Sequence, residues 1–201
     1  LLLLGSLSCA QFVGAGFLTC LGFYFLITCA YSWGLKRLVL IDCVTLAMLY
    51  TMRIIAGAAA SHQTITFWIL AFSVFLFLSL AFAKRYVELK LQQEKKQSKI
   101  HGRGYYTTDA SLLQTFGITA GYTAVLVLAL YLNSDSVLKL YAIPEYIWGT
   151  VPLMLFWISW VWMQAHRGNM HDDPVIFALK DKASLLTGIL FIALLIIGSI
   201  G

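Results

Sequence analysis

The chain has 201 residues, of which 60% are hydrophobic and only 11% are charged, and its mean hydropathy is +0.82. A soluble domain of this size cannot bury so much apolar surface, so the composition excludes a soluble globular protein and predicts an integral membrane protein. The first residues, LLLLGS, contain no Met and no basic segment. We therefore interpret the start as internal to a longer chain rather than as a signal peptide.

Six apolar stretches are long enough to cross a bilayer, which takes about 20 mostly apolar residues in a helix. They cover residues 9–30, 38–60, 66–83, 111–132, 146–165 and 184–200. Residues 1–8 are interpreted as the end of an earlier helix or a connector. Strict polar–apolar alternation is absent, which disfavours a β-barrel. The sequence predicts an all-α, polytopic transmembrane bundle that forms one domain over residues 1–201.

The loops between these stretches alternate in charge. The first, third and fifth loops span residues 31–37, 84–110 and 166–183, and they hold twelve of the Lys and Arg residues. The second and fourth loops, 61–65 and 133–145, hold only Lys139. Cytoplasmic loops are rich in Lys and Arg, so the odd loops are predicted to be cytoplasmic in a multi-pass protein of the cell (inner) membrane. This topology accounts for the net charge of +5, and no nucleic-acid partner is expected.

The second stretch carries two charged residues, Asp42 and Arg53, inside the membrane. They are 11 residues apart, which places them on one helix face about 16 Å apart along its axis. Charged residues inside a membrane usually mark a functional site or a structural ion pair. Two interpretations follow: this face lines a polar cavity in which Arg53 holds an anion, or both residues serve helix packing and snorkelling.

The third stretch ends in AFAKRYVELK, where Lys84 and Glu88 are spaced i, i+4 and share a helix face. A cation and a carboxylate at a cavity mouth bind phosphate or a metal. The alternative is a stabilising pair on the helix surface.

The fifth loop is the densest polar cluster and contains Arg167, Asp172 and Asp173. Its two histidines and two aspartates do not have the spacing of a zinc site. Asp173 followed by Pro174 predicts a helix start, with Asp at the N-cap and Pro at the first helical position. The first loop adds Tyr31, Lys36 and Arg37 to the same face. A positive rim of this kind suits an anionic group such as a diphosphate.

Four separated motifs in this order resemble the UbiA superfamily of membrane prenyltransferases. They are the run from YSWGLKR to MRIIAGAAA, the AFAKRYVELK helix end, the GRGY loop and RGNMHDDPVIFALKDKASL. The resemblance runs from about residue 31 to the end, and within the superfamily the branch that the chain resembles most is the decaprenyl-phosphate phosphoribosyltransferases.

The resemblance implies nine helices around a central cavity, of which the six stretches would be the fourth to the ninth. It also implies active-site loops on the cytoplasmic side. The first aspartate-rich motif of the family, of NDxxD type, belongs between its second and third helices and is absent from this sequence. We therefore expect the sequence alone to lack a complete active site.

The second family motif, DxxxD, is replaced here by Lys84–Glu88, which disfavours a quinone-pathway enzyme. It favours transfer of a phosphoribosyl group from phosphoribosyl diphosphate to a polyprenyl phosphate, with Mg²⁺. On this reading three residues are catalytic: Lys84, Glu88 and Asp42. Asp172 and Asp173 would bind the metal. The substrate-binding candidates are Tyr31, Lys36, Arg37, Arg53, Arg85 and Arg167.

Two alternatives stay open at this point. One is a UbiA-type enzyme that moves a prenyl group from a prenyl diphosphate to an aromatic or other acceptor. The other is a membrane transporter or assembly subunit without enzymatic activity. Transporters typically carry paired repeats with helices broken at the midplane, and the sequence has no such repeat.

Overall fold

The computed structural model describes residues 10, 13–96, 102–134, 137, 141, 143–170 and 173–200. Every regular element within these ranges is a helix. Six helices are long and apolar enough to cross a membrane. The prediction of an all-α, multi-pass membrane protein is therefore confirmed.

The spanning helices follow the apolar stretches closely, and short helices occupy the connections. The elements are α2 (Ala15–Trp33), η1 (Leu35–Arg37), α3 (Ile41–Ala60), α4 (Phe67–Glu94), η2 (Thr107–Asp109), α5 (Ala110–Leu132), α7 (Pro144–Ile147), α8 (Thr150–His166), α9 (Pro174–Lys180) and α10 (Lys182–Ile200).

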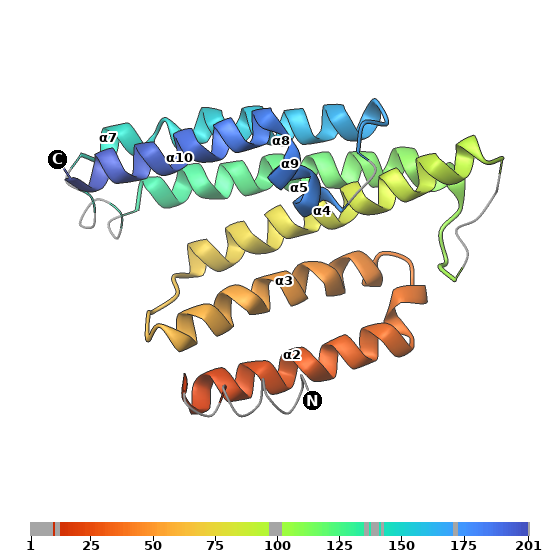
Figure 1. Ribbon diagram of the computed structural model, residues 1–201, viewed down its shortest axis with the longest axis horizontal. Coiled ribbons are helices and arrows are strands. Elements are labelled where there is room, and N and C mark those ends of the chain that lie inside the picture. The colour runs from red at the N-terminus through yellow and green to blue at the C-terminus, as the bar shows by residue number, and fades with distance from the viewer. Residues whose placement is uncertain are drawn as a thin grey trace.

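The helices form a packed group to which two further helices are added side by side (Figure 1). Helices α4, α5, α8 and α10 make up the group, α3 packs on α4, and α2 packs on α3. The contact between α5 and its neighbours depends on small residues. A Cβ on Gly117 would lie 2.1 Å from the Trp162 ring, and one on Gly121 would lie 2.7 Å from Ile158. Glycine lets helices approach closely in a membrane, where dispersion contacts drive packing.

Helix α4 is longer than the sequence predicts. The apolar stretch ends at residue 83, but the helix continues to Glu94. The added residues, KRYVELKLQQE, contain neither Gly nor Pro and favour a helix in water. The predicted loop 84–110 therefore begins too early: residues 84–90 continue the helix, as the i, i+4 spacing in AFAKRYVELK implies, and residues 91–94 extend it further. Hydropathy marks where a helix meets water, not where it ends.

The start of α9 is confirmed as predicted. The Asp173 side chain accepts a hydrogen bond of 3.0 Å from the Val175 backbone N–H, and Pro174 occupies the first turn. Helix α9 occupies part of the predicted loop 166–183, and it contacts both α4 and α10.

The three charged connections lie at the same end of the bundle (Figure 1). They join α2 to α3, α4 to α5 and α8 to α9. The connection between α3 and α4, the C-terminal end of α5 and the end of α10 lie at the opposite end. A polar site is therefore expected at this charged end of the bundle.

Candidate functional site

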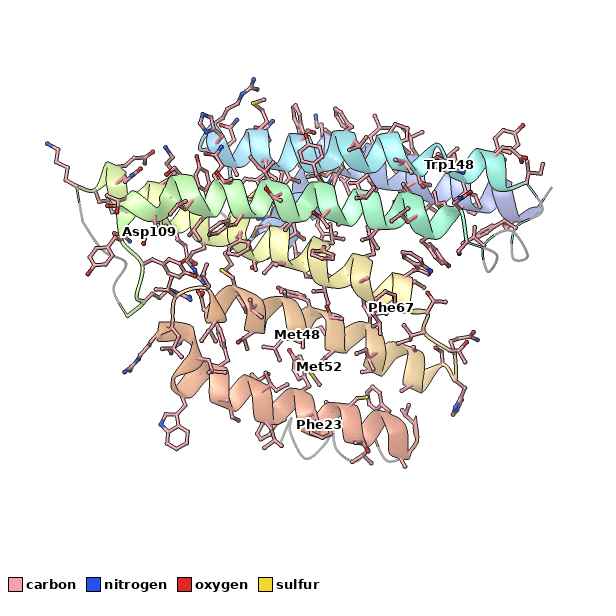
Figure 2. The ribbon with its side chains drawn as sticks, turned by 180° about the vertical axis from the view of Figure 1, so that it is seen from behind. Phe23, Met48, Met52, Phe67, Asp109 and Trp148 are labelled. Carbon is pink, nitrogen blue, oxygen red and sulfur yellow. The ribbon has the colours of Figure 1, made fainter. Side chains whose placement is uncertain are left out.

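A group of charged and aromatic side chains joins α3, α4 and the 102–106 segment at the charged end. We call it the ion-pair cluster, and its members are Asp42, Arg85, Glu88, Arg103 and Tyr105. Figure 2 marks this end of the bundle by the label of Asp109, which directly precedes α5.

Arg85 is the centre of the cluster. Its side chain is fully buried, and Nη2 lies 2.8 Å from the Asp42 carboxylate, which is also fully buried. Nη1 forms a second ion pair with Glu88. Its guanidinium carbon lies 5.8 Å from the centre of the Tyr105 ring. A buried charge is tolerated only when it is paired, and Arg85 satisfies this with two carboxylates.

Tyr105 connects the cluster to the backbone of the neighbouring connection. Its hydroxyl donates a 2.5 Å hydrogen bond to Asp42 and accepts a 2.7 Å hydrogen bond from the Leu40 N–H. Leu40 has a φ of 66°, which is unusual for a bulky residue. Burial raises the pKa of the Tyr105 phenol above its ordinary value, so the hydroxyl remains a donor to Asp42.

The two connections also approach each other at Gly104. A Cβ at this position would lie 2.9 Å from the Arg37 carbonyl oxygen and 2.9 Å from a Val39 methyl carbon. Only glycine permits this approach.

Arg103 is the accessible cation of the cluster. Its Nη1 lies 3.4 Å from the Tyr31 hydroxyl and 3.4 Å from the Asp42 carboxylate. Its Nε lies 3.6 Å from Glu88. The side chains of Arg103 and Glu88 are 22% and 31% exposed, so both can be reached from outside, whereas Arg85 and Asp42 cannot.

A second ion pair links α4 to α9. Lys84 Nζ lies 2.7 Å from Asp173 Oδ2, and the two side chains are 38% and 20% exposed. The two residues also line a small pocket between α3, α4 and α9, together with apolar and aromatic residues such as Tyr50 and Phe77. Lys84 is therefore part of the wall of a mostly apolar space.

An apolar cavity of about 380 Å³ lies between α4, α8, α9 and α10. Its walls include Leu76, Trp157 and Phe191, and its polar contribution comes from Ser184 and Thr187. Its size and composition are those of a site for an apolar chain.

The structure changes several predicted contacts. Lys84 and Glu88 do not pair with each other: Lys84 contacts Asp173, and Glu88 contacts Arg85 and Arg103. The i, i+4 spacing brings two side chains onto one face but does not exclude better partners on other elements.

Two of the predicted site residues, Asp42 and Arg85, have fully buried side chains. In this structure each contacts protein groups and presents no surface to a substrate. Direct contact of these two residues with a substrate would therefore require a rearrangement. Without one, they can act by holding neighbouring side chains in position.

Arg53 lies apart from the cluster, on the α2-facing side of α3. It is exposed, donates a 2.7 Å hydrogen bond to the Tyr24 hydroxyl and stacks on the rings of Tyr24 and Tyr50. Its Cα is about 16 Å along the helix axis from that of Asp42. One phosphate group therefore cannot contact both Arg53 and the cluster.

The remaining predicted residues fall in three places. Tyr31 contacts Arg103, Lys36 and Arg37 lie in η1 at the charged end, and Arg167 is the exposed residue after α8. Asp172 lies outside the described residues.

The described residues do not assemble a Mg²⁺ site. No group of three metal-ligating side chains is found among them. The Asp173 carboxylate is already used by Lys84 and by the start of α9, and those of Asp42 and Glu88 are held by Arg85 and Arg103.

Sequence reasoning missed two central members of the cluster, Arg103 and Tyr105. In the sequence, the GRGY segment contributes only to the family resemblance, and its side chains are given no role. The available signal was Asp42 itself, because a buried carboxylate requires several donors and the nearby connections were the place to look for them.

These observations define a multi-pass helical membrane protein with a buried ion-pair cluster at one end and an apolar cavity between its helices. No protein-family model matches the chain. Three curated proteins are similar to the chain in sequence.

The chain is 34% identical over 168 residues to an uncharacterized protein of Sinorhizobium fredii, y4nM, covering 83% of the chain and 33% of that protein. It is 34% identical over 164 residues to the nodulation protein NoeC of Azorhizobium caulinodans, covering 81% of the chain and 53% of that protein. It is 27% identical over 204 aligned residues to the decaprenyl-phosphate phosphoribosyltransferase of Mycolicibacterium smegmatis, covering all of the chain and 62% of that protein.

The chain thus spans between a third and about six tenths of the length of these relatives. The similarity to this phosphoribosyltransferase extends over the whole chain. It supports the resemblance drawn from the four sequence motifs.

Proposed function

We propose that the protein is a membrane transferase of UbiA type that transfers a phosphoribosyl group from phosphoribosyl diphosphate to a polyprenyl phosphate. The observation that carries the proposal is the combination of accessible cations at one end of the bundle with an apolar cavity that α4 also lines. The similarity to a decaprenyl-phosphate phosphoribosyltransferase supports it.

In this proposal the lipid chain lies in the apolar cavity and its phosphate reaches the charged end. A lipid phosphate oxygen attacks the anomeric carbon of the ribose, a C–O bond forms, and the bond to the diphosphate breaks. Both electrons of the broken bond leave with the diphosphate. Cations stabilise the negative charge that develops on this leaving group.

Lys84 and Arg103 are the cations best placed for this role, because they are partly exposed and already contact carboxylates. A bound phosphate would take the place of Asp173 beside Lys84 and of Glu88 beside Arg103. Lys36 and Arg37 would supply further positive charge from η1.

Arg85 and Asp42 act as positioning residues in the proposal. Their buried pair, together with Tyr105, fixes where Glu88 and Arg103 stand. Glu88 has the exposure to accept a hydrogen bond from a ribose hydroxyl. We also propose that the reaction requires Mg²⁺.

The orientation in the membrane also belongs to the proposal. The charged end is placed on the cytoplasmic side of the cell membrane because its connections hold most of the Lys and Arg residues.

The deciding experiment compares two labelled donors. The full-length protein in lipid nanodiscs is incubated with polyprenyl phosphate and either labelled phosphoribosyl diphosphate or labelled prenyl diphosphate, with and without Mg²⁺. We expect label in the lipid fraction only from phosphoribosyl diphosphate with Mg²⁺. Transfer from prenyl diphosphate to an added aromatic acceptor would instead establish the prenyl-transferring alternative. Transfer from neither donor would contradict both.

A further inference from the structure

A groove of about 320 Å³ runs between α5 and α8, on a different side of α4 from the ion-pair cluster. It is lined by Gln114, Ile118, Tyr122, Ile158, Ser159, Trp162, Met163 and His166. Gln114 and His166 lie at the charged end of the bundle, whereas Tyr122 and Ser159 lie about 10–12 Å deeper along their helices. The groove therefore begins at the level of the charged connections and extends into the apolar part of the bundle.

The floor of the groove is rigid. The Trp162 ring packs directly against Gly117, where a Cβ would lie 2.1 Å from it. The indole N–H donates a 3.1 Å hydrogen bond to Ser79, whose hydroxyl donates a 2.7 Å hydrogen bond to the Gly117 carbonyl. Because the floor is held by packing and by hydrogen bonds, the groove exists before anything occupies it.

His166 presents a hydrogen-bond donor at the charged end of the groove. The Tyr86 hydroxyl lies 3.1 Å from His166 Nδ1, and the Gln114 amide nitrogen lies 3.4 Å from the same atom. We assign Nδ1 as the acceptor of both groups and the ring hydrogen to Nε2, because an amide nitrogen only donates. Among the described residues none accepts a hydrogen bond from Nε2.

Two cations lie near this end. Arg167 follows His166 and is exposed, and Lys90 Nζ lies 5.8 Å from the centre of the Tyr86 ring. None of the described residues that line the groove is acidic. An occupant that matches these features has an anionic head, held by His166 and the two cations, and an apolar chain along Ile118 and Met163.

We propose that this groove binds a glycerophospholipid with an anionic phosphate headgroup, such as phosphatidylglycerol. Its headgroup contacts His166 at the level of the charged connections, and one acyl chain follows the groove towards Tyr122. Basic pockets between transmembrane helices bind anionic headgroups in this way. The site is separate from the proposed transferase site, because adjacent residues of α4 point in different directions: Arg85 faces α3 and Tyr86 faces α8.

The test measures lipid binding by the full chain in detergent, using native mass spectrometry. The probes are phosphatidylglycerol, phosphatidylcholine with the same acyl chains, and inorganic phosphate. Four variants are compared with the wild type. His166→Leu removes the Nε2 donor, His166→Gln keeps a donor at nearly the same place, and Ile118→Trp fills the groove. Lys95→Gln is the control, since it removes an exposed charge at the end of α4.

We expect one phosphatidylglycerol to bind about tenfold more tightly than phosphatidylcholine in the wild type and in Lys95→Gln. His166→Leu and Ile118→Trp should lose this preference, and His166→Gln should retain most of it. Thermal unfolding in the same detergent shows whether each variant is folded, and added phosphatidylglycerol should raise the melting temperature only where it binds.

Equal binding of the two lipids by the wild type would overturn the proposal, and so would wild-type binding by folded His166→Leu. Binding of inorganic phosphate that is unaffected by Ile118→Trp would show that the site takes free phosphate and not a lipid. None of these outcomes depends on transferase activity.

Discussion

The two arginines in the spanning helices, Arg85 and Arg53, have opposite environments in this fold. Arg85 is fully buried, and two carboxylates neutralise it. Arg53 is exposed, and its described contacts are the Tyr24 hydroxyl and two aromatic rings. The first arginine holds three segments of the chain together, whereas the second has its described contacts with α2 and its own helix.

The surroundings of the two residues differ in the same way. Around Arg85, α4 packs against α3, α5, α8 and α9. Around Arg53, α2 packs mainly on α3 and has no buried residue, and large apolar side chains such as Phe23 and Met48 are exposed (Figure 2). An arginine is thus a structural element where the fold surrounds it, and an available cation where the fold leaves it open.

The largest effect is expected for Arg85→Met. The substitution keeps most of the side-chain volume but leaves Asp42 buried without its closest cation. Removing one partner of a buried pair costs roughly 3–5 kcal/mol. We expect the variant to lose most of its stability in detergent, as measured by thermal unfolding.

Arg53→Met is the matched control for this experiment. A melting temperature that falls equally in the two variants would remove the distinction between the two arginines. Arg85→Lys should lie between Arg85→Met and the wild type, because it keeps the charge but not the two-sided pairing.

Lys84→Ala tests a partly exposed cation, which is intermediate in exposure between the buried Arg85 and the exposed Arg53. If Lys84 holds a phosphate, the variant loses a charge-assisted contact of about 1.5–3 kcal/mol, which is roughly a 10- to 100-fold loss of turnover. Stability should change little, because the pair with Asp173 is open to solvent. The readouts are turnover of the full-length protein and its melting temperature.

Lys95→Ala, at the end of the same helix, is the control for loss of a surface charge and should keep wild-type turnover. Near-wild-type turnover in Lys84→Ala would remove Lys84 from the proposed site and leave it as a link between α4 and α9.

Tyr105→Phe should destabilise the protein by about 1–3 kcal/mol, because Asp42 loses a buried hydrogen bond. The pH dependence adds a second readout. Burial raises the pKa of Tyr105 in the folded state, so above about pH 10 the unfolded chain releases a proton that the folded protein retains. Stability then falls as pH rises.

Tyr105→Phe removes this loss of stability at high pH, because it removes the phenol that titrates. We therefore expect the melting temperature to drop less between pH 9 and pH 11 in Tyr105→Phe than in the wild type. Identical drops would contradict the burial of this hydroxyl beside Asp42.

The smallest effect is expected for Arg53→Met itself. Its two contacts with aromatic rings are each worth about 0.5–1 kcal/mol at an exposed site. We expect a small decrease in melting temperature and no change in the pH profile. A loss as large as that of Arg85→Met would mean that Arg53 has a stronger partner than the described residues provide.

The comparison also explains which features the sequence could predict. The spanning helices can be predicted from hydropathy, because each residue that faces lipid has to be apolar. The start of α9 follows from Asp173 and Pro174, because capping is local. The extension of α4 to Glu94 did not follow from hydropathy, since a helix can continue into water.

The pairings within the site could not be predicted from spacing. Lys84 and Asp173 are 89 residues apart in the sequence, and Asp42 and Tyr105 are 63 apart. The i, i+4 rule describes only one helix, so it suggested Glu88 as the partner of Lys84. Which carboxylate meets which cation is decided by how α3, α4 and α9 pack together.

The length of α4 has a consequence for any lipid that the protein handles. Its 28 residues extend about 42 Å, which exceeds the roughly 30 Å hydrocarbon core of a bilayer. Arg85 lies about 27 Å and Glu88 about 32 Å from the start of the helix. If α4 enters the core at Phe67, the cluster stands at the boundary between the hydrocarbon core and the phospholipid headgroups on the other side. A lipid phosphate can then meet a water-soluble reactant there while its chain stays in the bilayer, so neither molecule has to cross into the other's solvent.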